Sequence, residues 1–172
     1  MALDVSRLEI VQYPDPVLRT VARPIDPIDD TVRAVAARMF ELMYEAEGAG
    51  LAAPQVGFSW RMFVTRSNDE HPDRVFINPS TPDLDGDLEV RVEACLSVPA
   101  LTVDVRRPTV ATVTSLDLDG RSMTLVAKGL MARIWQHEND HLNGVLIIDK
   151  MTPIDRIANR RLLKELEATG GQ

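Results

Sequence analysis

Apolar residues recur at helical spacing in two stretches of the chain. The first runs from a cap at Asp29 or Asp30 to about Ala46. Its stripe, which we expect to pack in the core rather than to bind a ligand, is Val32, Val35, Ala36, Met39, Phe40 and Met43. The second is Lys128–Gly144, with Leu130, Met131, Ile134, His137, His141 and Leu142 at three- and four-residue steps. Because its first turns are apolar on nearly every side, we expect a buried helix that ends at Asn143-Gly144.

The middle of the chain has the short β-branched or alternating runs that predict strands. These runs are Arg61–Thr65, Arg74–Asn78, Leu101–Arg106, Val110–Leu116 and Met123–Ala127. Asn68–Asp73 is polar and predicts a loop in which His71 is solvated. Asp117–Gly120, which reads DLDG, predicts a hairpin turn, and Val145–Ile148 predicts a short strand or turn. With helices at both ends, this pattern indicates one α+β domain over residues 1–172.

Both ends of the chain carry prolines that limit regular helix. Gln12–Asp30 contains four of them and is predicted to run extended over the surface, as a simple arm packed on the body. Thr152 and Pro153 can begin a last helix over Ile154–Ala168. Its expected buried stripe is Ile154, Ile157, Ala158, Leu162 and Leu166. A basic run at four-residue steps, typical of a solvated face, consists of Arg156, Arg160 and Lys164.

Composition narrows the class of protein. The chain has 172 residues, of which 45% are hydrophobic and 26% charged, as in ordinary globular domains. A net charge of −7 argues against nucleic acid as the main ligand, so we expect no direct DNA binding. One cysteine excludes an internal disulfide, and no apolar run is long enough for a membrane span. We therefore expect a cytoplasmic protein, or one of an organelle matrix if a targeting segment has been removed.

The helix over Lys128–Gly144 carries the sequence HENDH. Histidines four residues apart share a helix face, with Cβ atoms about 5–6 Å apart, so His137 and His141 can both reach one metal ion. Glu138 would then lie beside the metal, where it can handle the protons of a bound water. The alternative is a chance match, in which the pair are core histidines hydrogen-bonded to their surroundings.

A catalytic metal site of this kind needs a third protein ligand besides water. The candidates are Cys95, in a predicted bend between strands, or one of the many acids. A lone cysteine is most often a small buried hydrophobe, but a thiolate suits soft and borderline metals, so the two alternatives for Cys95 are evenly balanced. Gly48–Gly57, reading GAGLAAPQVG, has two readings as well: a tight turn, or a backbone rail for an extended ligand with Gln55 aimed into a cleft. Spacing alone slightly favours the turn.

The motifs GAGLAAPQVG, EACLS and QHENDH stand in one order along the chain. Together with the arm sequence YPDPVLR, they resemble the signature motifs of peptide deformylases, over nearly the whole chain except the last helix. The resemblance implies an α+β fold in which antiparallel β-sheets pack around a central metal-bearing helix, flanked by N-terminal and C-terminal helices. It also implies a metal-dependent hydrolase that removes the N-formyl group from N-formylmethionyl nascent polypeptides and releases formate.

The resemblance also implies roles for particular residues. The metal ligands would be Cys95, His137 and His141. Glu138 would be the catalytic acid and base, while Gln55 and the backbone N–H of Leu96 would stabilise the oxyanion. The ion implied is Fe²⁺, with Zn²⁺, Ni²⁺ or Co²⁺ able to occupy the site.

For the substrate, the resemblance implies that the backbone of Gly50 holds the peptide. We expect Leu96, Leu130 and Ile134 to wall the methionine pocket, although all three also suit ordinary core. A nascent-chain substrate implies the ribosome as a partner, and the basic run of the last helix is a candidate contact with ribosomal RNA.

Two details and two other function classes stay open. Alanine stands at position 94, where the family usually has glycine. A positive φ there would cost roughly 1 kcal/mol or more, whereas a negative φ, which we expect, adds only a methyl group near the site. Asp140 could hydrogen-bond a ligand histidine or pair with an arginine.

A zincin-type peptidase would take its third ligand downstream, but no histidine follows His141 and Glu165 lies on a predicted surface helix. An inactive paralogue is disfavoured by the intact Glu138 and Gln55.

Overall fold

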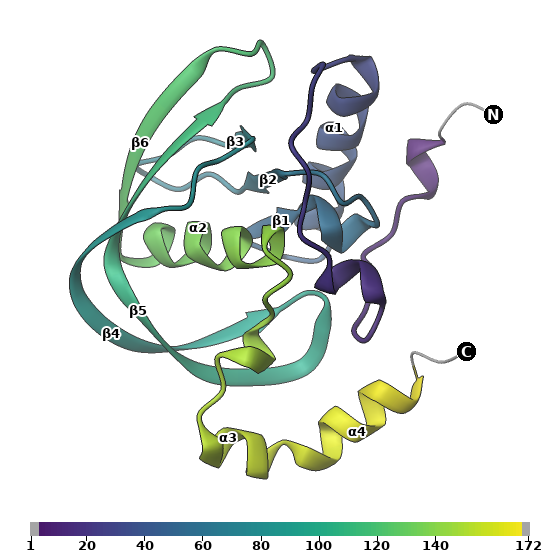
Figure 1. Ribbon diagram of the computed structural model, residues 1–172, viewed down its shortest axis with the longest axis vertical. Helices are drawn as coiled ribbons and strands as arrows, with labels where there is room; N and C mark the ends of the chain where they lie inside the picture. Colours follow the sequence, from purple (N-terminus) through teal and green to yellow (C-terminus); the bar gives the residue numbers. More distant parts are fainter. Residues whose placement is uncertain (1–3, 170–172) are drawn as a thin grey trace.

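The longest strand, β5 (Val98–Leu116), connects the other strands of the molecule. It pairs antiparallel with β4 (Asp83–Cys95) and β6 (Ser122–Lys128), and through the pair Ile77–Leu116 with β3 (Arg74–Ile77). From β3 the sheet continues to β2 (Met62–Thr65) and β1 (Gly50–Ala52), which gives the order β1-β2-β3-β5-β4 with β6 beside β5. The computed structural model, drawn in Figure 1, describes residues 4–169.

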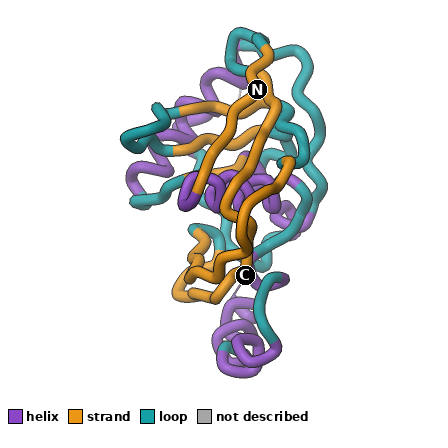
Figure 2. The backbone as a smooth tube through the Cα atoms, turned by 90° about the vertical axis from the view of Figure 1, so that its left-hand side faces the viewer, coloured by secondary structure: helices purple, strands orange, loops and turns teal. Residues whose placement is uncertain are grey.

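Helix α2 (Gly129–Leu142) lies in the middle of the molecule with strands around it, as Figures 1 and 2 show. Its Met131, Ala132, Trp135 and Leu142 pack against residues of the surrounding strands: Phe63, Phe76, Val113 and Ala127. The apolar surface removed from water on both partners supplies the main stabilisation of this arrangement. The predicted α+β class, with antiparallel strands around a central helix, is confirmed, although the strands form one bent sheet rather than several.

Helix α1 (Asp30–Glu45) covers β1 and β2. It begins where the Asp29 carboxylate accepts a hydrogen bond from the Val32 N–H at 3.0 Å, as the capping pattern predicted. The predicted stripe is buried against this sheet, except that Phe40 is half-buried and Leu42 joins the buried set. A short 3-10 turn, η1 (Val5–Arg7), packs beside the helix.

The prediction that Gln12–Asp30 runs extended over the surface is wrong in part. The segment contains a 3-10 helix, η2 (Pro16–Arg19), which begins with a proline and buries Leu18. Ala22 and Ile25 are buried as well. Proline at the first position of a turn costs no hydrogen bond, so these prolines prevent long helix without keeping the segment out of the core.

The strand prediction missed β4 and divided β5 in two. Outward-facing Leu88, Val90 and Val92 are exposed on β4, so this strand lacks the buried apolar face that marks a core strand. Strand β5 passes through Pro108 without a break because the register with β4 shifts beside it, between Asp85 and Leu88. Cys95, predicted in a bend between strands, is instead the last residue of β4.

The predicted last helix is two helices, α3 (Pro153–Ala158) and α4 (Arg160–Thr169). Thr152 caps α3 as predicted. The predicted stripe is wrong for Ile154 and Ile157, which are 78% and 76% exposed, and for Ala158. Its remaining members pack on the cluster around Leu18: they are Leu162 and Leu166. The chain bends between the two helices, so one continuous stripe does not form (Figure 1).

Three shorter segments complete the fold. The prediction of a strand or turn over residues 145–148 is wrong for its second half, because residues 147 and 148 belong to a 3-10 helix, η4 (Ile147–Asp149). The turn at Asp117–Gly120 is confirmed: the Asp117 N–H donates to the Arg121 carbonyl. His71 is not a solvated loop residue, because its half-buried ring meets the Trp135 ring edge-on at 5.6 Å. Within residues 4–169 we find no helix with the length and apolar character needed to cross a membrane.

Candidate active site

Three potential metal donors converge between α2 and the end of β4. The Nε2 atoms of His137 and His141 lie 3.3 Å apart, and the Cys95 Sγ lies 3.3 Å from the His141 Nε2. All three donor atoms lie within 4.8 Å of one another. The structure therefore brings together the three residues that the sequence analysis named as ligands.

Gln55 reaches the same place from the 3-10 helix η3 (Ala53–Val56). Its Oε1 accepts a hydrogen bond from the Ala52 N–H at 2.9 Å, which fixes the orientation of the amide. Its Nε2 then points to Cys95 Sγ, at 3.7 Å, and to Ser97 Oγ, at 3.2 Å. The side chain is buried, so the donor of this amide is held beside the three metal donors.

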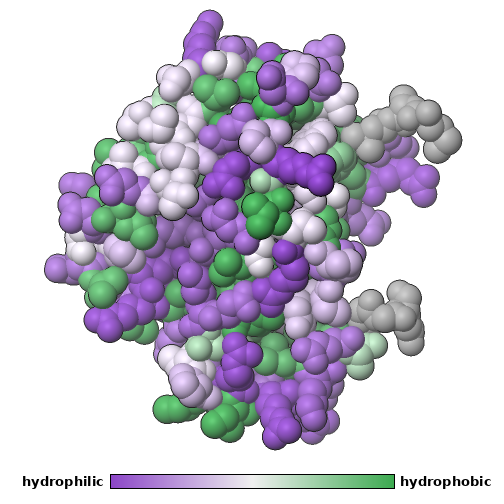
Figure 3. All heavy atoms as spheres, in the orientation of Figure 1, coloured by the Kyte–Doolittle hydropathy of each residue, from purple (hydrophilic) through white to green (hydrophobic). Residues whose placement is uncertain are grey.

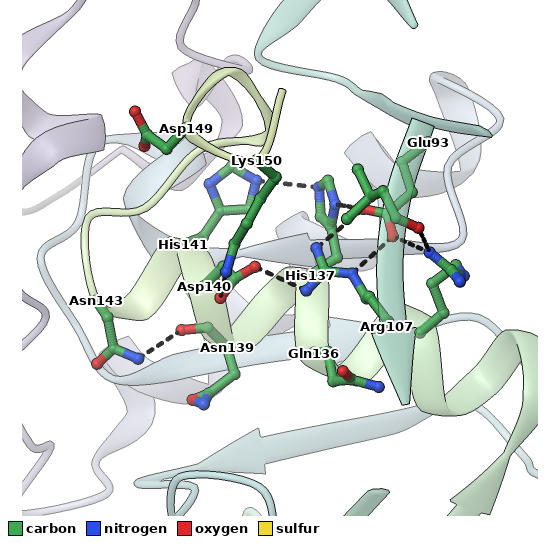
Figure 4. A network of polar contacts seen from close by, with 12 residues as sticks. Glu93, Arg107, Gln136, His137, Asn139, Asp140, His141, Asn143, Asp149 and Lys150 are labelled. Atoms are coloured by element: carbon green, nitrogen blue, oxygen red, sulfur yellow. Dashed lines mark hydrogen bonds and ion pairs between the residues drawn. The ribbon is translucent and has the colours of Figure 1, made fainter. Parts of the chain in front are cut away.

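A buried carboxylate, Glu93, orients one of the histidines (Figure 4). Its Oε2 lies 3.1 Å from the His137 Nδ1, and its two oxygens accept hydrogen bonds from Arg107 at 2.6 and 2.9 Å. Burial alone would raise its pKa, but the hydrogen bonds from His137 and Arg107 outweigh burial and hold the pKa at about 2. The sequence analysis gave no role to Glu93 or to Arg107. Had β4 been predicted, its two-residue period would have placed Glu93 on the same strand face as Cys95.

Asp140 is the other acid beside the histidines. Its Oδ2 accepts a hydrogen bond from Arg107 Nη1 at 2.8 Å, and its Oδ1 lies 3.6 Å from Lys150 Nζ. Of the two alternatives for Asp140, pairing with an arginine is thus the one observed. Asp140 and Glu93 share Arg107, so the three side chains join α2, β4 and β5 (Figure 4).

Glu138 is buried beside the donor cluster and against Gly50. A Cβ atom at Gly50 would lie 2.5 Å from Glu138 Oε1, so only glycine leaves room for this carboxyl group. Its Oε2 is buried without a hydrogen-bond partner in the described part of the chain. Burial raises the pKa of Glu138 to about 7. A carboxyl group with a pKa near neutrality can both take up and release a proton at neutral pH.

The two histidines have opposite electrostatic surroundings. Burial lowers the pKa of His141 well below its usual value, so this imidazole is neutral. Burial also acts to lower the pKa of His137, but the contacts with Cys95 and Glu93 outweigh it and raise the pKa to about 10. At neutral pH the donor cluster therefore holds a proton on His137 and none on the second ring nitrogen of His141. A divalent ion competes with protons for such donors, and one sulfur with two imidazole nitrogens suits a borderline metal. The donor set fits the ion that the motifs implied.

A cavity of about 320 Å³ opens beside these groups. Its walls include the predicted pocket residues Leu96, Leu130 and Ile134, with Gly50 of β1 also on its lining. The plain-core alternative is wrong for Leu130, which is 59% exposed, whereas Ile134 and Leu96 are half-buried.

Ala94 also lines this cavity. It pairs with Thr102 in the β4–β5 ladder. Within residues 4–169, the non-glycine residues with positive φ are Glu47, Asn78 and Ala100, so alanine causes no strain at position 94. As expected, the substitution amounts to one methyl group on the wall of the cavity.

Comparison with known proteins agrees with this architecture. Residues 7–157 match the family model described as polypeptide deformylase. Peptide deformylases of Stutzerimonas stutzeri and Azotobacter vinelandii are 45% and 46% identical over 161 residues, which cover 93% of this chain and 94% of each relative. A Plasmodium falciparum peptide deformylase in complex with an inhibitor superimposes with a TM-score of 0.85 at 41% identity, covering 92% of this chain and 98% of that one. Arabidopsis thaliana peptide deformylase 1B, also with an inhibitor, gives 0.89 at 36% identity, covering 94% and 91%. This chain belongs to the peptide deformylase family, the hydrolases that remove the N-formyl group from nascent polypeptides.

Proposed function

We propose that Cys95, His137 and His141 hold the catalytic metal ion of this deformylase, and that Glu138 transfers the protons. The observation that carries the proposal is the convergence of one sulfur and two imidazole nitrogens within 4.8 Å, beside a buried carboxyl group. A divalent ion held there supplies Lewis-acid activation, which lowers the pKa of water toward about 7 in zinc enzymes.

Glu138 has the position and the pKa for a proton shuttle. In the hydrolysis, water adds to the formyl carbon and the bond between that carbon and the amine nitrogen breaks, which leaves formate and a free N-terminus. The Glu138 carboxylate accepts the proton that the attacking water loses. It then gives that proton to the departing amine, so that the same group serves as base and acid in turn.

Gln55 and the backbone N–H of Leu96 stabilise the negative charge that develops on the formyl oxygen. The Gln55 amide nitrogen points into the donor cluster, and its orientation is fixed by the Ala52 N–H. Leu96 directly follows Cys95 in the turn between β4 and β5. One preorganised donor of this kind is worth on the order of 3 kcal/mol in the transition state.

The cavity beside Glu138 receives the methionine side chain of the substrate. Leu130 and Ile134 give it apolar walls, and the exposure of Leu130 is what a wall open to a ligand requires. Leu96 closes another side. Gly50 lies on β1, an edge strand of the sheet, where its backbone can hold an extended peptide.

Fe²⁺ is the native ion in this proposal, with Zn²⁺, Ni²⁺ or Co²⁺ able to take its place. An anionic sulfur ligand donates charge and makes the ion a weaker Lewis acid than three neutral histidines would, so its identity matters for rate. Ferrous iron beside Cys95 also makes the site sensitive to oxygen. Purification under argon should therefore preserve more activity than purification in air, and Zn²⁺-loaded protein should not show this difference.

Formate release from a formyl-Met peptide tests the proposal. After anaerobic purification, the chain should release formate in step with its metal content. Glu138→Gln should lower kcat by roughly 10²- to 10⁴-fold while the ion stays bound. Cleavage of an unformylated peptide would instead revive the zincin-type peptidase, and metal binding without any formate release would indicate an inactive paralogue.

The substrate places the enzyme where translation starts with formylmethionine, in the cytoplasm or in an organelle matrix, and we propose the ribosome as its partner. Helices α3 and α4 supply exposed Arg156, Arg160 and Lys164. Apolar side chains gather over α3 at the bottom of the molecule, beside hydrophilic ones over α4 (Figure 3). Reversing the three charges to glutamate should reduce co-sedimentation with ribosomes and leave formate release from a short peptide unchanged. Unchanged co-sedimentation would dispose of this contact.

A further inference from the structure

Arg133 lies on α2, one helical turn before His137, and the sequence motifs assign it no role. Arg133 is only 5% exposed, and it borders the cavity beside Glu138. Buried arginine is uncommon unless every charge is paired, so its partners show what holds it there.

The guanidinium group connects α2 to two strands. Nη1 donates to Glu93 Oε1 and to the Val105 carbonyl, both at 2.8 Å. Nη2 donates to the Glu89 carbonyl, also at 2.8 Å. Two of these acceptors belong to β4 and one to β5, so a single side chain attaches the central helix α2 to both of these paired strands.

These contacts lie directly beside two of the metal donors, Cys95 and His137. Glu93 precedes Cys95 by two residues on the same strand, and Arg133 precedes His137 by four on the same helix. The Glu93 carboxylate holds Arg133 through Oε1 and His137 through Oε2. The Cys95 thiol and the His137 imidazole therefore lie on two elements that Glu93 connects through both Arg133 and His137.

We infer that Arg133 is a positioning residue for the metal site, because it sets the spacing between the strand that carries Cys95 and the helix that carries the histidines. The inference rests on the proposed Cys–His–His ligand set. Arg107 also links Glu93 of β4 to α2, but it does so from β5 and at Asp140, three residues beyond His137, whereas Arg133 bonds Glu93 directly from the helix. Lysine could not replace Arg133 fully, since an ammonium group lacks the planar fork that meets separate acceptors.

The test is the dissociation constant for Zn²⁺ of the apo full-length chain, measured by competition with a chelator. Arg133→Met keeps an unbranched apolar stem of similar length but removes the donors, and should weaken Zn²⁺ binding by about 10- to 100-fold, as removal of groups that orient metal ligands does elsewhere. Arg133→Lys should fall between this variant and the wild type. Arg91→Met removes the same charge from an exposed position on β4 and should bind Zn²⁺ like the wild type.

A double-mutant cycle separates positioning from general loss of stability. If Arg133 acts through Glu93, the combination of Arg133→Met with Glu93→Gln should bind Zn²⁺ about as weakly as Glu93→Gln alone. Additive losses, or wild-type affinity in Arg133→Met despite a lowered Tm, would overturn the inference. If Arg133→Met does not fold, Arg133→Lys takes its place in the cycle with the same criteria. A wild-type chain that binds no Zn²⁺ would refute the proposed ligand set. Equally tight Zn²⁺ binding by the wild type and Arg133→Met would refute only the role of Arg133.

Discussion

Gly50 and Glu138 lie so close that a Cβ atom on the first would stand 2.5 Å from Oε1 of the second. Gly50→Ala should therefore push the carboxyl group aside and lower kcat roughly 100-fold, because displacement of a reacting group by about 1 Å has an effect of that size. Metal content should stay unchanged, since Glu138 is not a ligand. At Gly48 the added methyl would meet the mobile end of Leu96 instead, so Gly48→Ala should alter KM more than kcat. Equal kcat in Gly50→Ala and the wild type would show that Glu138 tolerates the displacement.

Gln55→Ala removes the side-chain donor aimed at the formyl oxygen. We expect kcat to fall by about 10²- to 10³-fold with little change in KM, since the bond forms in the transition state. Gln55→Glu should lose a similar amount, because it keeps the acceptor for the Ala52 N–H but cannot donate. Activity in Gln55→Glu close to that of the wild type would mean that this side chain only supports the turn. Metal analysis and Tm of both variants serve as controls.

Ala94→Gly restores the usual residue of the family on the cavity wall. Loss of one methyl contact with the substrate corresponds to about 0.8 kcal/mol, so KM for a formyl-Met peptide should rise about four-fold with kcat unchanged. Steady-state kinetics of formate release measure both constants. If KM and kcat both match the wild type, the methyl group does not shape the pocket.

Arg107 joins two buried or half-buried carboxylates, Glu93 and Asp140. Arg107→Met leaves both without this partner and should lower the free energy of unfolding by roughly 3 kcal/mol, as breaking buried ion pairs does. The exposed pair of Arg121 with Asp119 gives a matched control: Arg121→Met should change stability by about 1 kcal/mol or less. Urea denaturation followed by circular dichroism measures both. A loss in Arg107→Met no larger than in the control would mean that water replaces the guanidinium.

Local spacing made part of the site predictable. The four-residue step between His137 and His141 puts their rings on one helix face whatever the rest of the fold does, and the cap at Asp29 fixes the start of α1 within a residue. The apolar stripes of α1 and α2 likewise follow from the three- and four-residue spacing of apolar residues in the sequence. Such features depend on contacts between residues close in the chain.

Long-range pairing was not predictable in the same way. Glu93 and Arg133 are 40 residues apart in the chain, and no local period links them. Strand β4 escaped prediction because its alternating apolar residues face outward, and the bend at Asn159 turned Ile154 and Ile157 away from the core. The place of Cys95 beside the histidines, 46 residues from His141, came from the resemblance of motifs and not from spacing.

Metal stoichiometry tests the central claim most directly: Cys95, His137 and His141 form one ligand set. The wild-type chain and the variants Cys95→Ala, His141→Ala and Glu138→Gln would be purified without oxygen and analysed for bound divalent ions. We predict about one ion per chain in the wild type and Glu138→Gln, and loss of the ion in both ligand variants. A full complement of metal in folded Cys95→Ala would contradict the account.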